Sequence, residues 1–162
     1  MSYPAHPTAN SDASNPLIRL FLPLYGASFG EAVKRYFKKY AIFSGRASRS
    51  EYWWVALFNT LVALVAVAVM GIGGAFNLEP NSTEMPPGVV PGVLLLIVYG
   101  LATFIPNLAL TVRRLHDGYF SGWLYLLAFV PFVGSLVLLI LVLMPSSPAG
   151  VRYDKMWEWT VV

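Results

Sequence analysis

Two short polar motifs border long apolar stretches and contain the residue types that could do chemistry. Residues 43–54 read Phe-Ser-Gly-Arg-Ala-Ser-Arg-Ser-Glu-Tyr-Trp-Trp, and residues 113–117 read Arg-Arg-Leu-His-Asp. A charged side chain at the centre of a bilayer costs about 2.5 to 3.5 kcal/mol, so these charges must lie at a membrane surface or pair with one another. The candidate site residues are Gly45, Arg46, Arg49, Glu51, Arg113, Arg114, His116 and Asp117.

The charges of these motifs allow two kinds of site. In the first, Glu51 and Asp117 are the counter-ions of the four arginines, and the resulting salt-bridge network joins the first apolar segment to the connector after the second. In the second, the surplus positive charge binds the headgroup of an anionic lipid or a phosphate ligand, because guanidinium groups match the geometry of phosphate oxygens.

Catalysis is the weakest interpretation of the same residues. His116 titrates near neutral pH and stands beside Asp117, which would suit acid–base chemistry or proton coupling in a transporter. The spacing, however, reveals no nucleophile with an orienting base. The chain has no cysteine, and its only other histidine is His6. We therefore expect no enzymatic activity, no metal site and no cofactor.

Composition indicates a membrane protein. Hydrophobic residues make up 57% of the 162 residues and charged residues only 12%, against about 25% in soluble domains. Three stretches without any charged residue are each long enough to cross a bilayer. The predicted fold is an all-α integral membrane helical bundle with three transmembrane segments, at about residues 53–76, 92–111 and 123–144. The tryptophans that would anchor these segments at the membrane interface are Trp53, Trp54 and Trp123.

A basic amphipathic helix is predicted before the first transmembrane segment, over residues 29–40. Ser28 and Glu31 have the spacing of a capping box, which starts a helix. Aromatic residues follow on one face, and the other face carries Lys34, Arg35, Lys38 and Lys39. Such a helix is expected to lie in the membrane interface and to attract anionic lipids. The alternative is a helix packed against the transmembrane segments.

The domain boundaries follow from these elements. Residues 1–27 are expected to form a disordered or surface-lying N-terminal tail, because they are rich in proline, alanine, serine and asparagine and lack a secretory signal. Residues 28–153 form the membrane domain, and residues 154–162 form a C-terminal tail.

The basic residues predict a cytoplasmic N-terminus. Residues 34–49 contain six lysines and arginines, the first connector none, the second connector two and the tail two. With three spans, this orientation leaves eight basic residues inside and two outside. If Pro131 and Gly134 broke the third segment into a re-entrant hairpin, all ten would lie inside. Three full spans are the first choice here, because irregular backbone within a membrane must be covered by protein.

The two motifs, followed by Pro-Ala-Gly-Val-Arg-Tyr at residues 148–153, closely resemble a bacterial inner-membrane family catalogued as domain of unknown function 805. The resemblance covers about residues 29–153. The family's usual ending is Asn-Arg-Tyr-Gly, so the chain departs from it at Val151 and Asp154. The resemblance implies a small, multi-span helical protein of the bacterial plasma membrane, with no established activity.

The sequence thus predicts a multi-pass plasma-membrane protein that acts as a non-enzymatic scaffold or interaction protein. Its expected partners are the lipid bilayer, in particular anionic lipids, and other membrane proteins or further copies of the chain. We expect no nucleic acid partner. Binding of an anionic lipid or a phosphate ligand at the cytoplasmic face is the alternative function.

Overall fold

The computed structural model describes residues 22–76 and 85–154. In chain order, the helical elements are α2 (Phe29–Lys38), α3 (Arg49–Ile72), α4 (Val89–Asp117), the 3₁₀ helix η1 (Gly122–Phe129), α5 (Val133–Leu143) and the 3₁₀ helix η2 (Pro148–Tyr153). All regular elements within these two ranges are helical, which confirms the predicted all-α class. The greater part of the predicted N-terminal tail, and the C-terminal tail after Asp154, lie outside the described residues.

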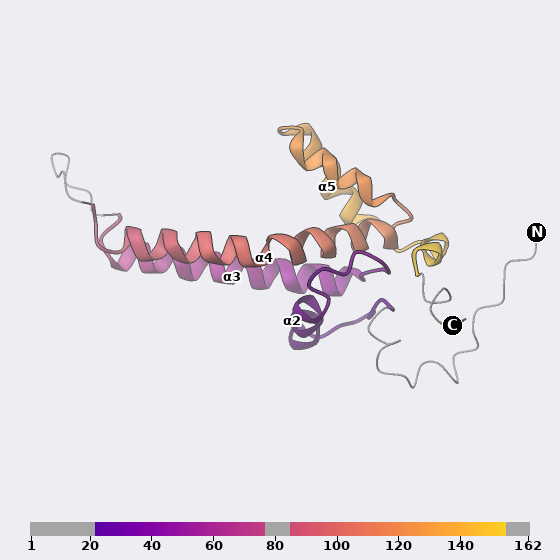
Figure 1. Cartoon of the computed structure of the whole chain (residues 1–162), viewed down its shortest axis with the longest axis horizontal. Helices are drawn as coiled ribbons and strands as arrows, with labels where there is room; N and C mark the ends of the chain where they lie inside the picture. The colour runs from indigo at the N-terminus through magenta and orange to yellow at the C-terminus, as the bar shows by residue number, and fades with distance from the viewer. Residues whose placement is uncertain (1–21, 77–84, 155–162) are drawn as a thin grey trace, which may run out of the picture.

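Helices α3 and α4 form an antiparallel pair along the long axis of the molecule (Figure 1). At about 1.5 Å per residue, their 24 and 29 residues extend over about 36 and 44 Å, more than the roughly 30 Å of a bilayer core. Both are apolar, and few of the residues in their apolar stretches are buried in the protein. Two of the three predicted spans are therefore helices of suitable length and composition.

Helix α4 continues through the polar motif at residues 113–117, which the sequence had suggested lies in a connector. The helix ends only at Asp117, with Gly118 as its C-cap, and Tyr119 follows with a φ of 68°. Because α4 is longer than the bilayer is thick, its last turn can carry Arg113, Arg114 and Asp117 beyond the apolar zone without leaving the helix.

The third predicted span, over residues 123–144, is not confirmed. Two separate elements, η1 and α5, occupy this stretch, and the chain reverses between them at Pro131 and Phe132, where φ is 59°. The 11 residues of α5 extend over about 16 Å, about half of a bilayer core. A Cβ at Gly134 would lie 1.8 Å from the carbonyl oxygen of Leu127, so only glycine lets α5 pass this close to η1.

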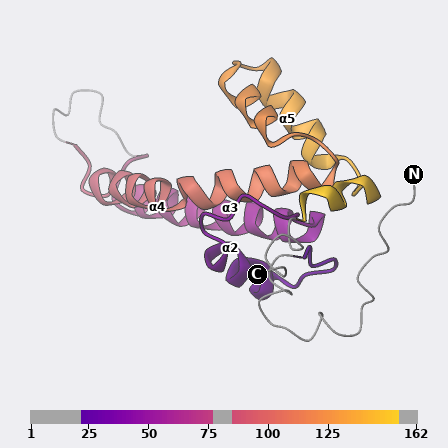
Figure 2. The same ribbon diagram turned by 45° about the vertical axis from the view of Figure 1, so that its right-hand side comes forward.

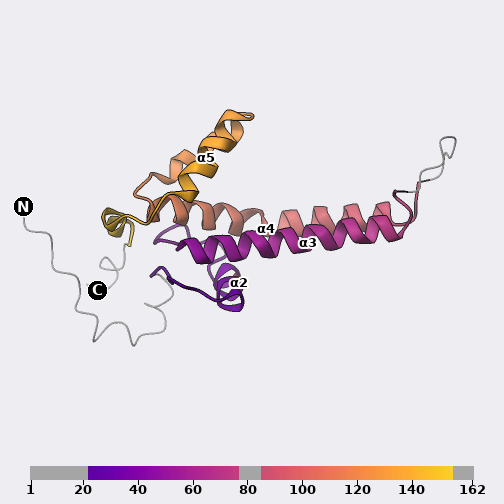
Figure 3. The ribbon, with the colours of Figure 1, turned by 180° about the vertical axis from the view of Figure 1, so that it is seen from behind.

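This η1–α5 hairpin begins and ends beside the same end of α4. At its start, a Cβ on Gly122 would lie 2.8 Å from Cγ1 of Val112. After its end, the amide of Ser147 donates a hydrogen bond of 2.8 Å to the carbonyl oxygen of Asp117. The hairpin and α2 lie on opposite sides of the α3–α4 pair (Figures 1 and 3). The structure thus has the hairpin form that the sequence offered as an alternative to a third span.

Helix α2 starts with the predicted capping box and packs against the long helices. The Ser28 hydroxyl accepts a hydrogen bond from the backbone amide of Glu31, and the Glu31 carboxylate accepts one from the backbone amide of Ser28. At the other end, the hydroxyl of Tyr40 donates a 2.6 Å hydrogen bond to the carbonyl oxygen of Ala102. Pro106 has no N–H to reach that carbonyl, so Tyr40 supplies the donor that the proline removes from α4.

A chain of side-chain hydrogen bonds joins α2, α3 and α4 within the apolar zone. The amide oxygen of Asn107 accepts from the hydroxyl of Tyr36 at 2.8 Å and from the amide group of Asn59 at 2.9 Å. The amide oxygen of Asn59 accepts in turn from the hydroxyl of Tyr99 at 2.5 Å. These polar groups satisfy one another, as polar side chains between membrane helices commonly do.

Candidate functional site at the polar end

The predicted site residues gather at the end of the α3–α4 pair where α3 begins and α4 ends, which we call the polar end. Asp117 lies at its centre and is fully buried. One carboxylate oxygen accepts hydrogen bonds from Arg114 and, at 2.5 Å, from the hydroxyl of Ser146. The other accepts from the hydroxyl of Tyr25 at 3.2 Å and lies 3.9 Å from Nη1 of Arg46. Asp117 therefore connects four separate stretches of the chain.

Arg114 and Arg49 hold the C-terminus of α5 against the polar end. Arg114 donates from Nε to the carbonyl oxygen of Val142 at 3.0 Å and from Nη2 to that of Met144. Arg49 donates from Nη2 to the carbonyl oxygen of Leu143 at 2.6 Å. The last carbonyls of a helix have no partner within it and carry partial negative charge, so two guanidinium groups complement them well. Both arginines thus have protein partners at the site where the sequence predicts either a salt-bridge network or anion binding.

A second buried pair brings the end of the described chain into the site. Nη2 and Nε of Arg46 lie 2.6 and 2.9 Å from the same carboxylate oxygen of Asp154. Burial raises the pKa of the Asp154 carboxyl above its ordinary value, and its hydrogen bond with Arg46 opposes that rise. Asp154 lies where the chain departs from the family ending, and the pair ties this residue to the loop before α3. Figure 2 shows η2, which leads to Asp154, beside this end of the long helices.

Glu51 has a different partner from those expected. Its carboxylate caps α3 by accepting from the amide of Ser48 at 3.0 Å, and it also accepts from the amide of Leu24 at 3.2 Å. Its ion pair is with Arg35 of α2, at 2.5 Å between Oε1 and Nη1. The sequence had placed Arg35 on the basic face of this helix, where it would attract anionic lipid, and had assigned Glu51 to the arginines of the two motifs.

Two further cations are buried at the polar end. Lys39 and Arg113 are each only 2% exposed. Nζ of Lys39 and Nη2 of Arg113 have no hydrogen-bond partner among the described residues, although Nε of Arg113 donates to the carbonyl oxygen of Ala109 at 3.2 Å. Burial, reinforced by the charge of Arg113, lowers the pKa of Lys39 to about 7. Of the four residues predicted to form the basic face of α2, Lys34 and Lys38 are the exposed ones.

His116 and Asp117 are adjacent in sequence but have different partners. The His116 ring stacks on that of Tyr153, with centroids 4.0 Å apart, and Nδ1 lies 3.3 Å from the carbonyl oxygen of Gly45. The amide of Gly45 in turn donates to the carbonyl oxygen of Tyr153 at 3.0 Å. His116 thus helps to pack η2 against the loop before α3. Within the described ranges, no three His, Cys, Asp or Glu residues are close enough to hold a metal ion.

The predicted tryptophan anchors are exposed, as an interfacial position requires. Trp54 also donates from Nε1 to the carbonyl oxygen of Ala27 at 2.8 Å, so it helps to hold the start of α2. Trp123 is 79% exposed at the start of η1.

The sequence did not identify three of the residues that complete the site, namely Tyr25, Ser146 and Asp154. All three lie outside the two motifs. Only an indirect observation pointed to the region of Ser146 and Asp154. All ten basic residues lie on one side of the membrane only if the tail returns to the side of the two motifs. No comparable signal pointed to Tyr25, because its role depends on how the segment before α2 folds back.

Comparison with known proteins identifies the family. A model of the family described as "Protein of unknown function (DUF805)" matches residues 40–155. The chain belongs to the DUF805 family. The inner membrane protein YhaI of Escherichia coli K12 is 41% identical over 118 residues, covering 73% of this chain and 87% of YhaI. The inner membrane protein YhaH of the same strain is 32% identical over 116 residues, covering 72% of this chain and 87% of YhaH. No solved structure matches the chain.

The family membership and the two long apolar helices confirm the prediction of a bacterial inner-membrane protein. They also confirm the resemblance drawn from the polar motifs, because the matched residues include both. The family has no assigned activity, so any role must be argued from the geometry of this chain.

Proposed function

We propose that this DUF805 protein is a non-enzymatic protein of the bacterial plasma membrane that acts as a scaffold, through contacts with lipid and with other membrane proteins. The observation that carries the proposal is the pairing of the buried carboxylates at the polar end. Glu51 pairs with Arg35 and joins α3 to α2, and Asp154 pairs with Arg46 and joins the tail to the loop before α3. Asp117 pairs with Arg114 of its own helix, and its contact with Arg46 at 3.9 Å links α4 to that loop. Side chains committed to one another in this way stabilise a fold and are poorly placed to do chemistry on a substrate.

The proposed topology has two spans and a re-entrant hairpin, with the polar end in the cytoplasm. The hairpin leaves the polar end at Gly122 and returns to it at Ser147. All ten basic residues from Lys34 onward then lie on the cytoplasmic side, in agreement with the positive-inside rule. Re-entrant backbone within a membrane needs protein cover. Packing of η1 against α4 supplies part of it.

The exposed apolar surface supports the interaction role. Leu64 and Val98, for example, are both more than half exposed on the two long helices. Such a surface suits acyl chains and also the helices of a partner membrane protein or of a second copy. An enzyme or a transporter that uses His116 and Asp117 is the weaker candidate, because those two side chains have separate structural partners.

The structural role of the polar end is tested by the variants Asp117→Asn and His116→Gln. Breaking a buried ion pair leaves its partner uncompensated and costs about 3 to 5 kcal/mol. Asp117→Asn should therefore reduce both the abundance of the protein in membranes and its melting temperature in detergent, and His116→Gln should change both far less. Glu31→Gln, an exposed carboxylate that can still cap α2, is the control. Unchanged abundance and melting temperature in Asp117→Asn would overturn the structural role.

The interaction role is tested separately by placing a photo-crosslinking amino acid at Leu64 or Val98 in cells. We expect crosslinked products with other membrane proteins or with a second copy of the chain. Crosslinks to lipid alone, at both positions, would contradict a scaffold.

A further inference from the structure

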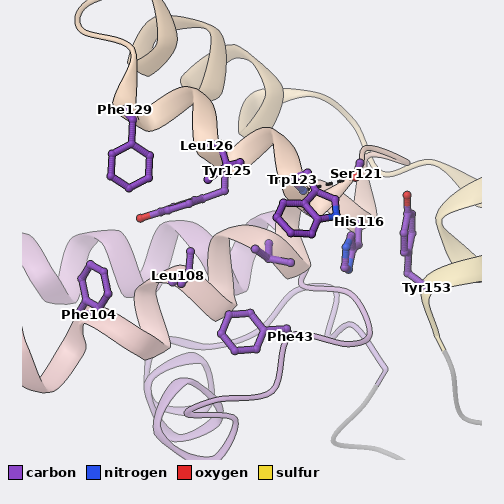
Figure 4. Close-up of a pocket in the computed structure, with 12 residues that line it drawn as sticks. Phe43, Phe104, Leu108, His116, Ser121, Trp123, Tyr125, Leu126, Phe129 and Tyr153 are labelled. Carbon is purple, nitrogen blue, oxygen red and sulfur yellow. Dashed lines mark hydrogen bonds between the residues drawn. The ribbon is translucent and has the colours of Figure 1, made fainter.

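A groove of about 610 Å³ runs along α4, between that helix and η1. Figure 4 shows its arrangement, with Phe104 and Leu108 of α4 facing Leu126 and Phe129 of η1. Phe43, from the loop before α3, also lines it. None of these five side chains carries a polar group, and Tyr125, which lies between Phe129 and α4 in Figure 4, adds one hydroxyl. The walls of this part are therefore mainly apolar and favour an apolar occupant.

The end of the groove nearest the polar end is different. It is lined by His116, Ser121 and Tyr153, which supply an imidazole and two hydroxyl groups. The guanidinium group of Arg152 lies over the rings of Tyr153 and Tyr119. Its carbon is 4.7 Å from the Tyr153 ring centroid and 4.5 Å from that of Tyr119. It is exposed, and the hydrogen bonds that it donates go to the hydroxyls of these two tyrosines, which carry no negative charge to neutralise it. A positive charge thus lies next to Tyr153 of the polar mouth, although Arg152 itself does not line the groove.

The length of the groove matches one leaflet of a bilayer. Phe104 and His116 are twelve residues apart on α4, which corresponds to about 18 Å along the helix. One leaflet contributes about half of the roughly 30 Å hydrocarbon core. With the polar end at the membrane surface, the polar mouth lies at the level of the lipid headgroups, and the apolar part extends through the adjoining leaflet.

We propose that this groove binds one anionic phospholipid from the bilayer. An acyl chain lies along α4 between Phe104 and Leu126, and the phosphate lies at the mouth, near Tyr153 and Arg152. A guanidinium group is well suited to phosphate, and the apolar walls match a hydrocarbon chain. Phe43 and His116 of the two polar motifs line the groove, but its cation is a different one from those to which anion binding had been assigned, because Arg113 and Arg114 are buried and Arg152 is exposed. The inference requires the membrane placement of the proposed function but not its scaffold role.

Native mass spectrometry of the purified, delipidated protein in neutral detergent tests the site. Phosphatidylglycerol and the zwitterionic phosphatidylcholine are added in separate titrations. We expect one phosphatidylglycerol to be retained per chain, more tightly than phosphatidylcholine. A basic residue near a membrane surface contributes about 1 kcal/mol, so Arg152→Gln should weaken phosphatidylglycerol binding about fivefold. Lys34→Gln, which removes an exposed charge from α2, should leave it unchanged. Glycerophosphate, which lacks acyl chains, should not compete.

The apolar part of the groove is tested with Leu126→Trp, which fills it from η1. This variant should lose phosphatidylglycerol binding while its melting temperature stays close to that of the parent protein. Leu101→Trp, the same change at an exposed position of α4 outside the groove lining, should bind as the parent does.

Equal binding of both lipids together with no effect of Arg152→Gln would overturn the proposal. So would a change of oligomeric state in Leu126→Trp without loss of lipid, because the groove would then be a contact between copies. Either result would leave the effect of Asp117→Asn on abundance intact, so failure of the lipid site and failure of the scaffold proposal are distinguishable.

Discussion

Replacing Lys39 by methionine removes a buried charge and keeps a side chain of similar length. The Lys39 ammonium group has no hydrogen-bond partner among the described residues. The charged groups that act on it are Arg113 and Arg35, which disfavour its positive charge, and Glu51 and Asp154, which favour it. Burial is the largest effect, and it lowers the pKa from 10.5 to about 7. The folded protein therefore disfavours the protonated form of Lys39 relative to the unfolded chain.

The magnitude follows from the difference in pKa. At about 1.36 kcal/mol per unit, the protonated form is penalised by about 4 to 5 kcal/mol. Between pH 7 and 10.5 the unfolded chain keeps a proton on Lys39 that the folded protein has lost, so the free energy of unfolding rises with pH in this window. Lys39→Met removes the penalty. It should stabilise the protein by about 4 kcal/mol at pH 7 but only about 2 kcal/mol at pH 9.

The assay is thermal unfolding in a mild detergent at pH 7 and pH 9, followed by tryptophan fluorescence. For a chain of this size, about 4 kcal/mol corresponds to a rise in melting temperature of about 8 to 16 °C. The matched control is Lys38→Met, because Lys38 is the exposed neighbour on the same helix. A lower melting temperature in Lys39→Met would refute the reasoning, since it would mean that the folded protein uses the charge. A rise in melting temperature that is as large at pH 9 as at pH 7 would also refute the reasoning.

Two further predictions concern packing between elements. Asn107→Leu leaves the hydroxyl of Tyr36 and the amide of Asn59 without their shared acceptor, so it should cost about 1 to 3 kcal/mol in thermal unfolding. Thr60→Val, which removes a hydrogen bond within one helix, should cost less, and equal losses would contradict the interhelical role. Gly150→Ala would place a Cβ 2.6 Å from the carbonyl oxygen of His116, so it should displace η2 and destabilise the protein by about 1 to 3 kcal/mol. A Cβ at Gly100 meets nothing within 4 Å, so Gly100→Ala should be neutral or stabilising; the same result at Gly150 would contradict the tight packing of η2.

The features predicted well from sequence are those set by local patterns. Ser28 and Glu31 are three residues apart and form the expected capping box, because each satisfies an amide of the other within one helical turn. The charge-free stretches in residues 53–76 and 92–111 coincide with most of the two long apolar helices for an equally local reason. The association of Asp117 with Arg114 also follows from their spacing on one helix.

The features that sequence did not predict depend on long-range contacts. The third apolar segment is long enough to span, and its reversal at Phe132 is stabilised by contacts from distant residues, with Arg49 and Arg114 holding the end of α5. Lys39 was predicted to lie on the basic face of an interfacial helix, and it is buried because α2 packs against the long helices. Asp154 looked like a departure from a family motif, and its importance depends on Arg46, which is 108 residues away.

The central claim is that the third apolar segment returns to the side of the polar motifs, and cysteine labelling in intact cells and inverted membrane vesicles tests it most directly. The chain has no cysteine, so single substitutions report without background. Met85→Cys marks the connector between α3 and α4, Ser44→Cys the loop before α3, and Ala149→Cys the tail. With a membrane-impermeant thiol reagent, we expect Met85→Cys to react in intact cells, and Ser44→Cys and Ala149→Cys to react only in inverted vesicles. Labelling of Ala149→Cys in intact cells, together with Met85→Cys, would contradict the hairpin and restore a third span.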